Sequence, residues 1–251
     1  AQYNLGVMYH NGQGVPQDHK EAVKWYRMSA EQGDPGAQSN LGAMYYNGQG
    51  VPQDYKEAVK WYRISAEQGF PLAQYNLGAM YTNGLGVPQD FKKAVKWYRK
   101  SAEQGYLEAQ NGLGFMYDGG HGVPQNDKEA VKWYRKSAEQ GDPNAQNNLG
   151  MMYMEGEGVP QDFRKAINWY RKSAEQGNVL AQSNLGLMYV TGRGVPQDNI
   201  YAHIWWSIAA SSGETTAATN RDKVVEEMTK DQIEEAQRLA RECVKNNYKD
   251  C

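Results

Sequence analysis

The sequence predicts an all-α solenoid of six helix pairs, closed at its C-terminal end by a helical cap. Two observations carry this prediction. The motif AVKWYR occurs four times at intervals of 36 positions, at Ala22–Arg27, Ala58–Arg63, Ala94–Arg99 and Ala130–Arg135. Within each interval, apolar residues recur three and four positions apart, which is the spacing of one face of an α-helix. Such a fixed period indicates stacked repeats that bury their apolar faces against one another.

The same period sets the domain organisation. An alanine recurs every 36 positions from Ala1 to Ala181, and a tryptophan does so from Trp25 to Trp205, with no insertion. We therefore predict six repeats, at 1–36, 37–72, 73–108, 109–144, 145–180 and 181–216. The divergent residues 217–251 are expected to form the capping helices.

The first helix of each repeat is predicted to begin at the alanine and to end at two glycines. In the first repeat Leu5, Met8 and Tyr9 lie on one face of this helix. The pair Gly12-x-Gly14 then ends it, because glycine readily adopts the left-handed conformation of helix C-termini. The Val-Pro pair that follows cannot continue a helix.

The second helix of each repeat is predicted to begin at a polar N-cap. Asp18 takes this position in the first repeat and Asn126 takes it in the fourth, and either side chain can accept the free N–H groups of the first turn. Where glutamate follows three residues later, at Glu21, Glu57 and Glu129, the sequence allows a capping box.

The second helix is expected to contribute small and aromatic residues to the core. Ala22, Tyr26, Ser29 and Ala30 share one face before the helix ends at Gly33. The repeated serines are therefore interpreted as small core residues and not as nucleophiles. The Trp-Tyr pairs are expected in the core as well.

These motifs resemble known helical repeats. The pattern Leu5-Gly6-x-x-Tyr9 resembles the tetratricopeptide repeat, and the longer period, the G-x-G-V-P-Q-D connection and the A-E-Q-G ending are similar to Sel-one-like repeats from residue 1 to about 216. The resemblance implies a bacterial protein with a right-handed superhelix of antiparallel helix pairs, used as an adaptor or binding scaffold. The sixth repeat departs from the pattern, since Ser207, Ser211 and Ser212 replace Arg, Glu and Gln.

The positions that vary between the six copies are interpreted as either solvated or used for recognition of a partner. In the first helices these are the third, seventh and tenth positions, which form one face opposite the Leu-Met-Tyr face. In tetratricopeptide-like stacks the first helices line the concave surface, so this first-helix stripe is the predicted site for a protein or peptide partner. An alternative is that a tight superhelix buries the stripe against neighbouring first helices. The predicted partner-binding residues are Tyr3, Tyr46, Tyr75, Phe115, Asp118, Met151, Met154, Leu187 and Val190.

Charge and hydropathy argue against other classes of partner. The chain has 27 Lys and Arg against 29 Asp and Glu, so nothing favours nucleic acid or an anionic membrane. The longest apolar run, Ile204–Ala210, is too short to span a bilayer. We expect a monomer with no cofactor.

No catalytic or metal-binding constellation is predicted. The four histidines, His10, His19, His121 and His203, show no metal-ligand spacing among themselves or with the cysteines. The protein is therefore interpreted as a non-enzyme. Two alternatives stay open: the resemblance allows an exported protein that binds or hydrolyses a β-lactam or cell-wall ligand, and near-identical repeats allow a structural spacer or a designed array. A pocket with one unique serine would favour the enzyme.

The outer face of the sixth repeat indicates that the tail covers it. Tyr201, Ile204 and Ile208 stand where the earlier repeats are mostly polar. Two candidate covers follow, Thr215–Met228 and a helix that begins at the capping box Thr229-x-x-Gln232. The second helix is expected to present Ile233, Ala236, Ala240 and Val244 to the sixth repeat.

The prediction of the cellular compartment rests on the two cysteines. The family resemblance implies a bridge between Cys243 and Cys251, because exported members join cysteines at the spacing Cys-x7-Cys, and a buried free thiol at Cys243 is the alternative. A bridge favours a periplasmic or secreted protein, with the cytoplasm as runner-up. Because the chain opens on Ala1 inside a first helix, we also expect native sequence before it.

Arg27 and Glu31 are four residues apart, and both are lost together in the sixth repeat. An ion pair within the helix would stabilise it by only about 0.3–0.5 kcal/mol. We therefore predict that the arginine acts between repeats, so that Arg63, Arg99 and Arg135 contact the repeat that follows.

Overall fold

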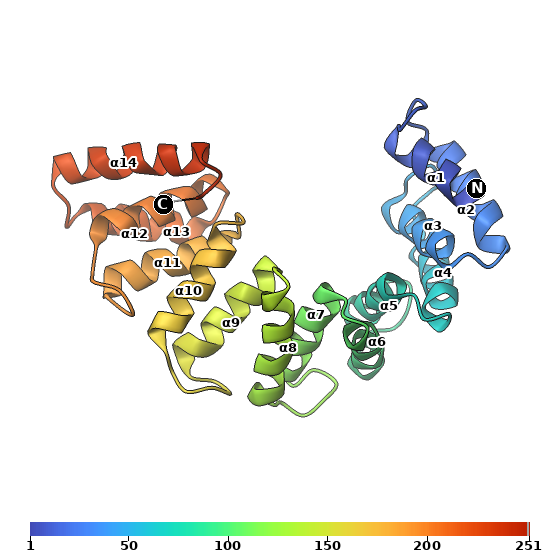
Figure 1. Ribbon diagram of the computed structural model, residues 1–251, viewed down its shortest axis with the longest axis horizontal. Coiled ribbons are helices and arrows are strands. Elements are labelled where there is room, and N and C mark those ends of the chain that lie inside the picture. The colour runs from blue at the N-terminus through green and yellow to red at the C-terminus, as the bar shows by residue number, and fades with distance from the viewer. Residues whose placement is uncertain (250) are drawn as a thin grey trace. The chain divides into compact units, whose positions relative to one another are not determined.

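The computed structural model describes residues 1–249 and 251 (Figure 1). Within these residues the chain is all-α, as predicted, and contains no strand. The helices are α1 (Gln2–Asn11), α2 (His19–Glu31), α3 (Pro35–Asn47), α4 (Tyr55–Glu67), α5 (Pro71–Asn83), α6 (Phe91–Glu103), α7 (Leu107–Asp118), α8 (Asp127–Glu139), α9 (Pro143–Glu155), α10 (Phe163–Ala174), α11 (Val179–Thr191), α12 (Asn199–Ser211), α13 (Thr215–Val225) and α14 (Lys230–Lys245).

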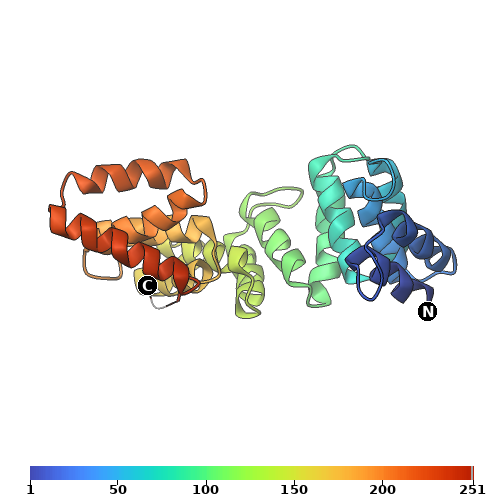
Figure 2. The ribbon, with the colours of Figure 1, turned by 90° about the horizontal axis from the view of Figure 1, so that it is seen from above.

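The helices fall into two compact blocks. The first block, Ala1–Gln125, holds α1 to α7, and the second block, Asn126–Cys251, holds α8 to α14. Within each block every helix packs against the helix before it and the helix after it, up to the cap. Figure 2 shows this succession from above, with the first block running from blue to green. This is the stacking that the sequence period predicts.

The predicted caps set the helix boundaries. Asp18 Oδ1 accepts hydrogen bonds from the backbone N–H groups of Lys20 and Glu21, at 2.8 and 3.1 Å, and so starts α2. Gly12 ends α1 with φ at 68°, a left-handed conformation that suits glycine. The first helices of the later repeats begin two residues earlier than predicted. In the second repeat the reason is that Asp34 accepts from the N–H of Ala37 and a proline takes the first helical position.

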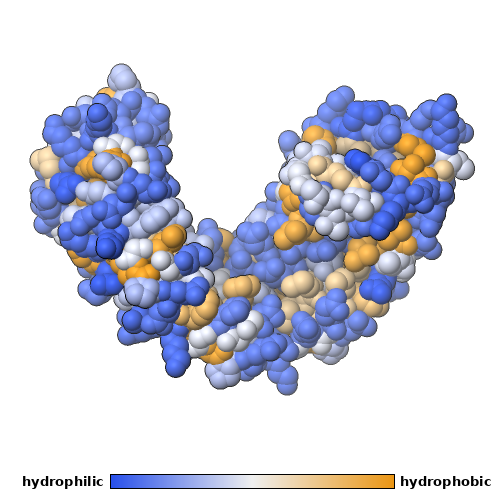
Figure 3. All heavy atoms as spheres, turned by 180° about the vertical axis from the view of Figure 1, so that it is seen from behind, coloured by the Kyte–Doolittle hydropathy of each residue, from blue (hydrophilic) through white to orange (hydrophobic). Residues whose placement is uncertain are grey.

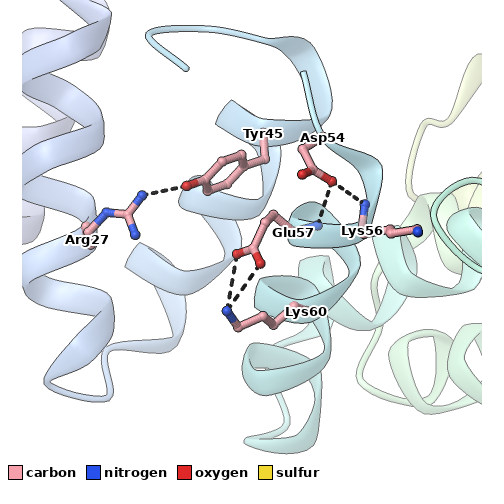
Figure 4. Close-up of polar contacts among 6 residues, drawn as sticks. All are labelled: Arg27, Tyr45, Asp54, Lys56, Glu57 and Lys60. Carbon is pink, nitrogen blue, oxygen red and sulfur yellow. Dashed lines mark hydrogen bonds and ion pairs between the residues drawn. The ribbon is translucent and has the colours of Figure 1, made fainter. Parts of the chain in front are cut away.

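The capping boxes that the sequence allows at Glu21, Glu57 and Glu129 do not form. The Glu21 carboxylate instead pairs with the Lys24 ammonium at 3.2 Å, and Glu57 and Glu129 pair with the lysines three residues later in the same way. Figure 4 shows this arrangement for Glu57 and Lys60, beside the Asp54 cap. The reciprocal box does form at Thr229, where the cap residue and Gln232 exchange both hydrogen bonds.

The core of each repeat depends on a close approach between its two helices. Leu41 and Met44 of α3 are fully buried, in one core cluster with Tyr26 and Trp61 of the second helices. A Cβ atom added to Gly42 would lie 2.8 Å from Cδ1 of Tyr62, so only glycine lets the two helices come this close. In the sixth repeat Trp206 takes the place of the tyrosine, and its indole N–H donates to the Ser183 carbonyl at 3.1 Å.

Only some of the repeated tryptophans are buried in the core, where we predicted all of them. Trp61, Trp133 and Trp205 are buried, whereas the copies at 25, 97 and 169 are half-buried. Lysines of the outer face cover them; the Lys100 ammonium, for example, lies 4.8 Å from the centre of the Trp97 ring. A cation over an indole face is favourable, so these rings sit at the edge of the core.

The prediction that the arginine acts between repeats is confirmed. The guanidinium of Arg27 donates to the Tyr45 hydroxyl at 2.5 Å, from α2 to α3 (Figure 4). Among the described residues no ion pair joins Arg27 to Glu31. The same bond recurs along the chain, as Arg63 to Tyr81, Arg99 to Tyr117, Arg135 to Tyr153 and Arg171 to Tyr189.

The cap covers the apolar outer face of the sixth repeat. Both α13 and α14 pack on α12, and Ile204 and Ile208 are 2% and 1% exposed. Two parts of the prediction were wrong. Tyr201 is not covered by α14 but stacks on the Tyr189 ring at 5.0 Å. Val244 is 44% exposed, and Cys243 takes the buried position because it continues the face of Ala236 and Ala240.

The 36-residue period continues one step beyond the six predicted repeats. Ala217 stands 36 positions after Ala181 and is fully buried, like the alanine of every later repeat. Glu214 caps α13 by accepting from the N–H groups of Thr216 and Ala217, as Asp34 does at the start of α3. α13 is therefore the first helix of a degenerate seventh repeat, while α14 lies on the outer face of α12.

Candidate functional site

The first-helix stripe lines two neighbouring pockets in the first block. One lies between α1 and α3, has a volume of about 280 Å³, and is lined by Tyr3, Val7, His10 and Ala43 of the stripe. The other lies between α3 and α5 and has a volume of about 430 Å³. Its stripe residues are Ala43, Tyr46, Tyr75 and Ala79. Figure 3 shows apolar atoms, in orange, gathered at the surface between hydrophilic ones.

Aromatic rings hold the walls of these pockets in place. Tyr46 packs against Tyr55 with ring centroids 5.4 Å apart, and Tyr75 packs against Tyr98 and Tyr106 at 5.7 and 5.5 Å. Side-chain amides form the rims, from Asn11, Asn40, Asn47, Asn76 and Asn83. Since an amide both donates and accepts hydrogen bonds, such a rim can bind the backbone of a peptide.

The pocket lining is uncharged near neutral pH. Burial raises the pKa of Tyr26, at the floor of the α1–α3 pocket, to about 12. Burial, with a smaller contribution from His19, lowers the pKa of His10 in the same pocket. Both groups are therefore neutral, and the pocket favours apolar and neutral polar segments.

The predicted stripe residues divide into exposed and half-buried side chains. Tyr46, Phe115 and Leu187 are 37%, 49% and 36% exposed. The remaining predicted residues are half-buried: Tyr3, Tyr75, Asp118, Met151, Met154 and Val190. One residue of the stripe, Asn147 of α9, is buried against the neighbouring first helix. It is 6% exposed and accepts a hydrogen bond from the Asn184 amide of α11 at 3.0 Å.

The stripe carries further apolar side chains in both blocks, beside polar ones such as Asp118 and Asn147. In the first block the Phe115 ring of α7 packs against the ring of His121, in the loop that follows α7. The two ring centroids are 5.3 Å apart. In the second block Met151 and Met154 of α9 belong to the stripe, and the Met154 sulfur accepts from the Tyr170 hydroxyl at 3.7 Å. Leu187 extends the stripe on α11.

A groove that the sequence analysis did not anticipate lies between α12 and α14. Its volume is about 510 Å³, and its lining is mainly apolar. The signal in the sequence was the loss of Arg and Glu at Ser207 and Ser211, which both line it. Ser207 Oγ lies 3.2 Å from Nδ1 of His203, a buried imidazole whose pKa is lowered by burial and by the Arg221 charge.

The cysteines lie at the end of α14. Cys243 is 4% exposed and forms a disulfide with Cys251, with the two Cα atoms 5.3 Å apart. Over residues 1–249 and 251, no three His, Cys, Asp or Glu side chains are grouped to hold a metal ion. No helix in the same residues is long and apolar enough to span a membrane.

Comparison with known proteins identifies the repeats. A family model described as Sel1 repeat matches residues 1–34, 35–70, 71–106, 107–142, 143–178 and 179–214. The crystal structure of a Sel1 repeat protein from Oxalobacter formigenes has a TM-score of 0.80 and 36% identity, over 86% of this chain and 84% of that one. No curated protein sequence matches.

Two further crystal structures share the fold at 22% identity. Immunity protein PA5088 from Pseudomonas aeruginosa gives a TM-score of 0.56 over 88% of this chain and 82% of that one. A putative sel1 repeat protein from Klebsiella pneumoniae gives 0.54 over 81% of this chain and 99% of that one.

Proposed function

Because the chain belongs to the Sel1 repeat family, we propose that it is a non-catalytic scaffold that binds a protein or peptide segment along its first helices. One observation carries the proposal. Two pockets of about 280 and 430 Å³ lie next to each other along the stripe and share Ala43 and Asn47. A row of pockets with apolar walls and amide rims suits an extended segment that places successive side chains in them.

Photo-crosslinking tests the proposal. Benzoylphenylalanine in place of Tyr46 should capture the partner, because Tyr46 lines the α3–α5 pocket and is partly exposed. The matched control is the same residue in place of Ile64, which is equally exposed, at 36%, but lies on the second helix α4. Equal capture at both positions would remove the stripe from the proposal.

The compartment is part of the same proposal. The disulfide between Cys243 and Cys251 supports an oxidising environment, and hence a periplasmic or secreted scaffold. Fractionation of the source cells, with the protein detected by antibody, tests this. Recovery in the cytoplasmic fraction alone would contradict it.

A second candidate, acyl transfer at Ser207, is favoured by one observation. Ser207 is a serine unique to the sixth repeat, lines the α12–α14 groove and contacts the buried imidazole of His203. The test measures the rates at which the protein and its Ser207→Ala variant hydrolyse an activated ester and a β-lactam. Equal rates for the two proteins would reject it.

A further inference from the structure

The groove between α12 and α14 is lined on one side by residues that depart from the repeat pattern in the sixth repeat. In earlier repeats the arginine at this position reaches a tyrosine of the next first helix, as Arg171 reaches Tyr189 at 2.9 Å. Here Ser207 replaces the arginine and Val225, one period after Tyr189, replaces the tyrosine. Ser211 replaces the glutamate. Two large side chains of the groove lining are thus exchanged for serines, and the tyrosine that the arginine would reach is exchanged for a valine.

The lining of this groove combines an apolar part with a cationic rim. Ile208, Ala240 and Val244 supply the apolar part of the lining, and Val244 is 44% exposed. Arg241 and Lys245 line one edge. The ion pairs of α14 in the described part of the chain are made by other cations, Lys230 and Arg238, so this edge carries two positive charges without an acidic partner in an ion pair.

The spacing of the lining matches an α-helix. On α12 the serines at 207 and 211 are one helical turn apart. On α14 the apolar residues Ala240 and Val244, and the rim residues Arg241 and Lys245, repeat with the same interval of four. Side chains of a docking helix recur at this interval, so its ridges can lie between such walls.

From these observations we propose that the α12–α14 groove is a second binding site, which takes an amphipathic helix of a partner protein. Its apolar face packs on Val244, next to the nearly buried Ile208 and Ala240, and two carboxylates one turn apart pair with Arg241 and Lys245. This site is independent of the first-helix stripe. It would let the scaffold hold one partner along the stripe and another at the cap.

Titration with a synthetic helix tests the proposal on the whole chain. The probe is a capped peptide of about 18 residues, with leucines at i, i+3, i+4 and i+7 and glutamates four apart beside them. Its control carries lysine for each glutamate. We expect the glutamate peptide to bind and the lysine peptide to bind at least about tenfold more weakly, since like charges at the rim repel.

Two variants connect this binding to the groove. Arg241→Gln with Lys245→Gln should weaken the glutamate peptide about three- to tenfold, the effect of two exposed ion pairs. Ser207→Arg with Ser211→Glu restores the residues of the regular repeat, fills the groove and should abolish binding. Lys230→Gln, on α14 but outside the groove lining, is the matched control and should bind like the unaltered protein.

The rim variant leaves the packed face of α14 intact, so circular dichroism should show unchanged helicity. Unchanged affinity in the rim variant, or equal binding of the lysine peptide, would overturn the proposal. Binding of laurate without binding of either peptide would also overturn it, because the groove would then be a small-molecule site.

Discussion

Arg63 donates a hydrogen bond to the hydroxyl of Tyr81 at 3.0 Å and so joins the second helix of one repeat to the first helix of the next. Five such bonds recur at the same positions in the described residues. We expect Arg63→Ala and Tyr81→Phe each to lower the free energy of unfolding by about 1–2 kcal/mol, because each removes a hydrogen bond with a charged donor.

Urea denaturation measures this effect, and Glu67→Ala is the control. Glu67 is four residues after Arg63, and no ion pair joins the two in the part of the chain that the structure describes. The control should therefore change stability by less than about 0.5 kcal/mol. A larger loss for Glu67→Ala than for Tyr81→Phe would mean that the contact within the helix dominates.

Two glycines of first helices should respond to alanine in opposite directions. In Gly42→Ala the new methyl group would lie 2.8 Å from the Tyr62 ring, so we expect a loss of about 1–3 kcal/mol. In Gly112→Ala the nearest atom is 3.6 Å away, in the Tyr98 ring, which is an ordinary contact. This variant should gain about 0.5–1 kcal/mol from helix propensity. Thermal unfolding compares the two, and a gain for Gly42→Ala would contradict the close packing of the helices.

The bridge between Cys243 and Cys251 closes a short loop. Cys251→Ser should lower stability by at most about 2–3 kcal/mol, mainly through fraying at the end of α14. Mass spectrometry after alkylation without reduction should find neither cysteine alkylated in protein exported by its own host. Two alkylated thiols would remove both the bridge and the argument for an exported protein.

The cap should be needed for stability. Deletion of residues 229–251 removes α14 and exposes Ile204 and Ile208, which are 2% and 1% exposed in the complete chain. Burial of each side chain contributes about 1.5–3 kcal/mol, so the truncated chain should melt at a lower temperature and aggregate. An unchanged melting temperature with full solubility would show that the sixth repeat needs no cover.

Much of this fold could be predicted because every repeat packs its two helices in the same way. The alanine, leucine and tyrosine positions recur where a helix meets its neighbours, so the period alone predicts the helix pairs and the stacking. The partner of the arginine was not predicted. Tyr45 and its copies lie on the apolar face, and their hydroxyls reach the repeat boundary only in three dimensions.

The cap was harder to predict, because it departs from the repeat pattern. In α13 only Ala217 and Asn220 keep residues of the first-helix motif, while Arg221 and Asp222 replace its leucine and glycine, so the role of α13 as a degenerate first helix was missed. In α14 either Cys243 or Val244 fits the apolar face by spacing, and packing against α12 decides for Cys243. The groove is open where the small side chains of Ser207 and Ser211 replace arginine and glutamate. A pattern of hydrophobic residues does not reveal such a change of side-chain size.

We propose that the partner binds the first-helix stripe. The most direct test uses the partner identified by photo-crosslinking and measures by calorimetry its affinity for the double variant Phe115→Glu with Met151→Glu. The control is the double variant Met28→Glu with Ile64→Glu. Met28 and Ile64 are exposed apolar residues of second helices, at 38% and 36%. The stripe variant should keep its helicity and lose about 1–3 kcal/mol of binding free energy per anchor, while the control binds normally. Equal affinity for both variants would contradict the claim.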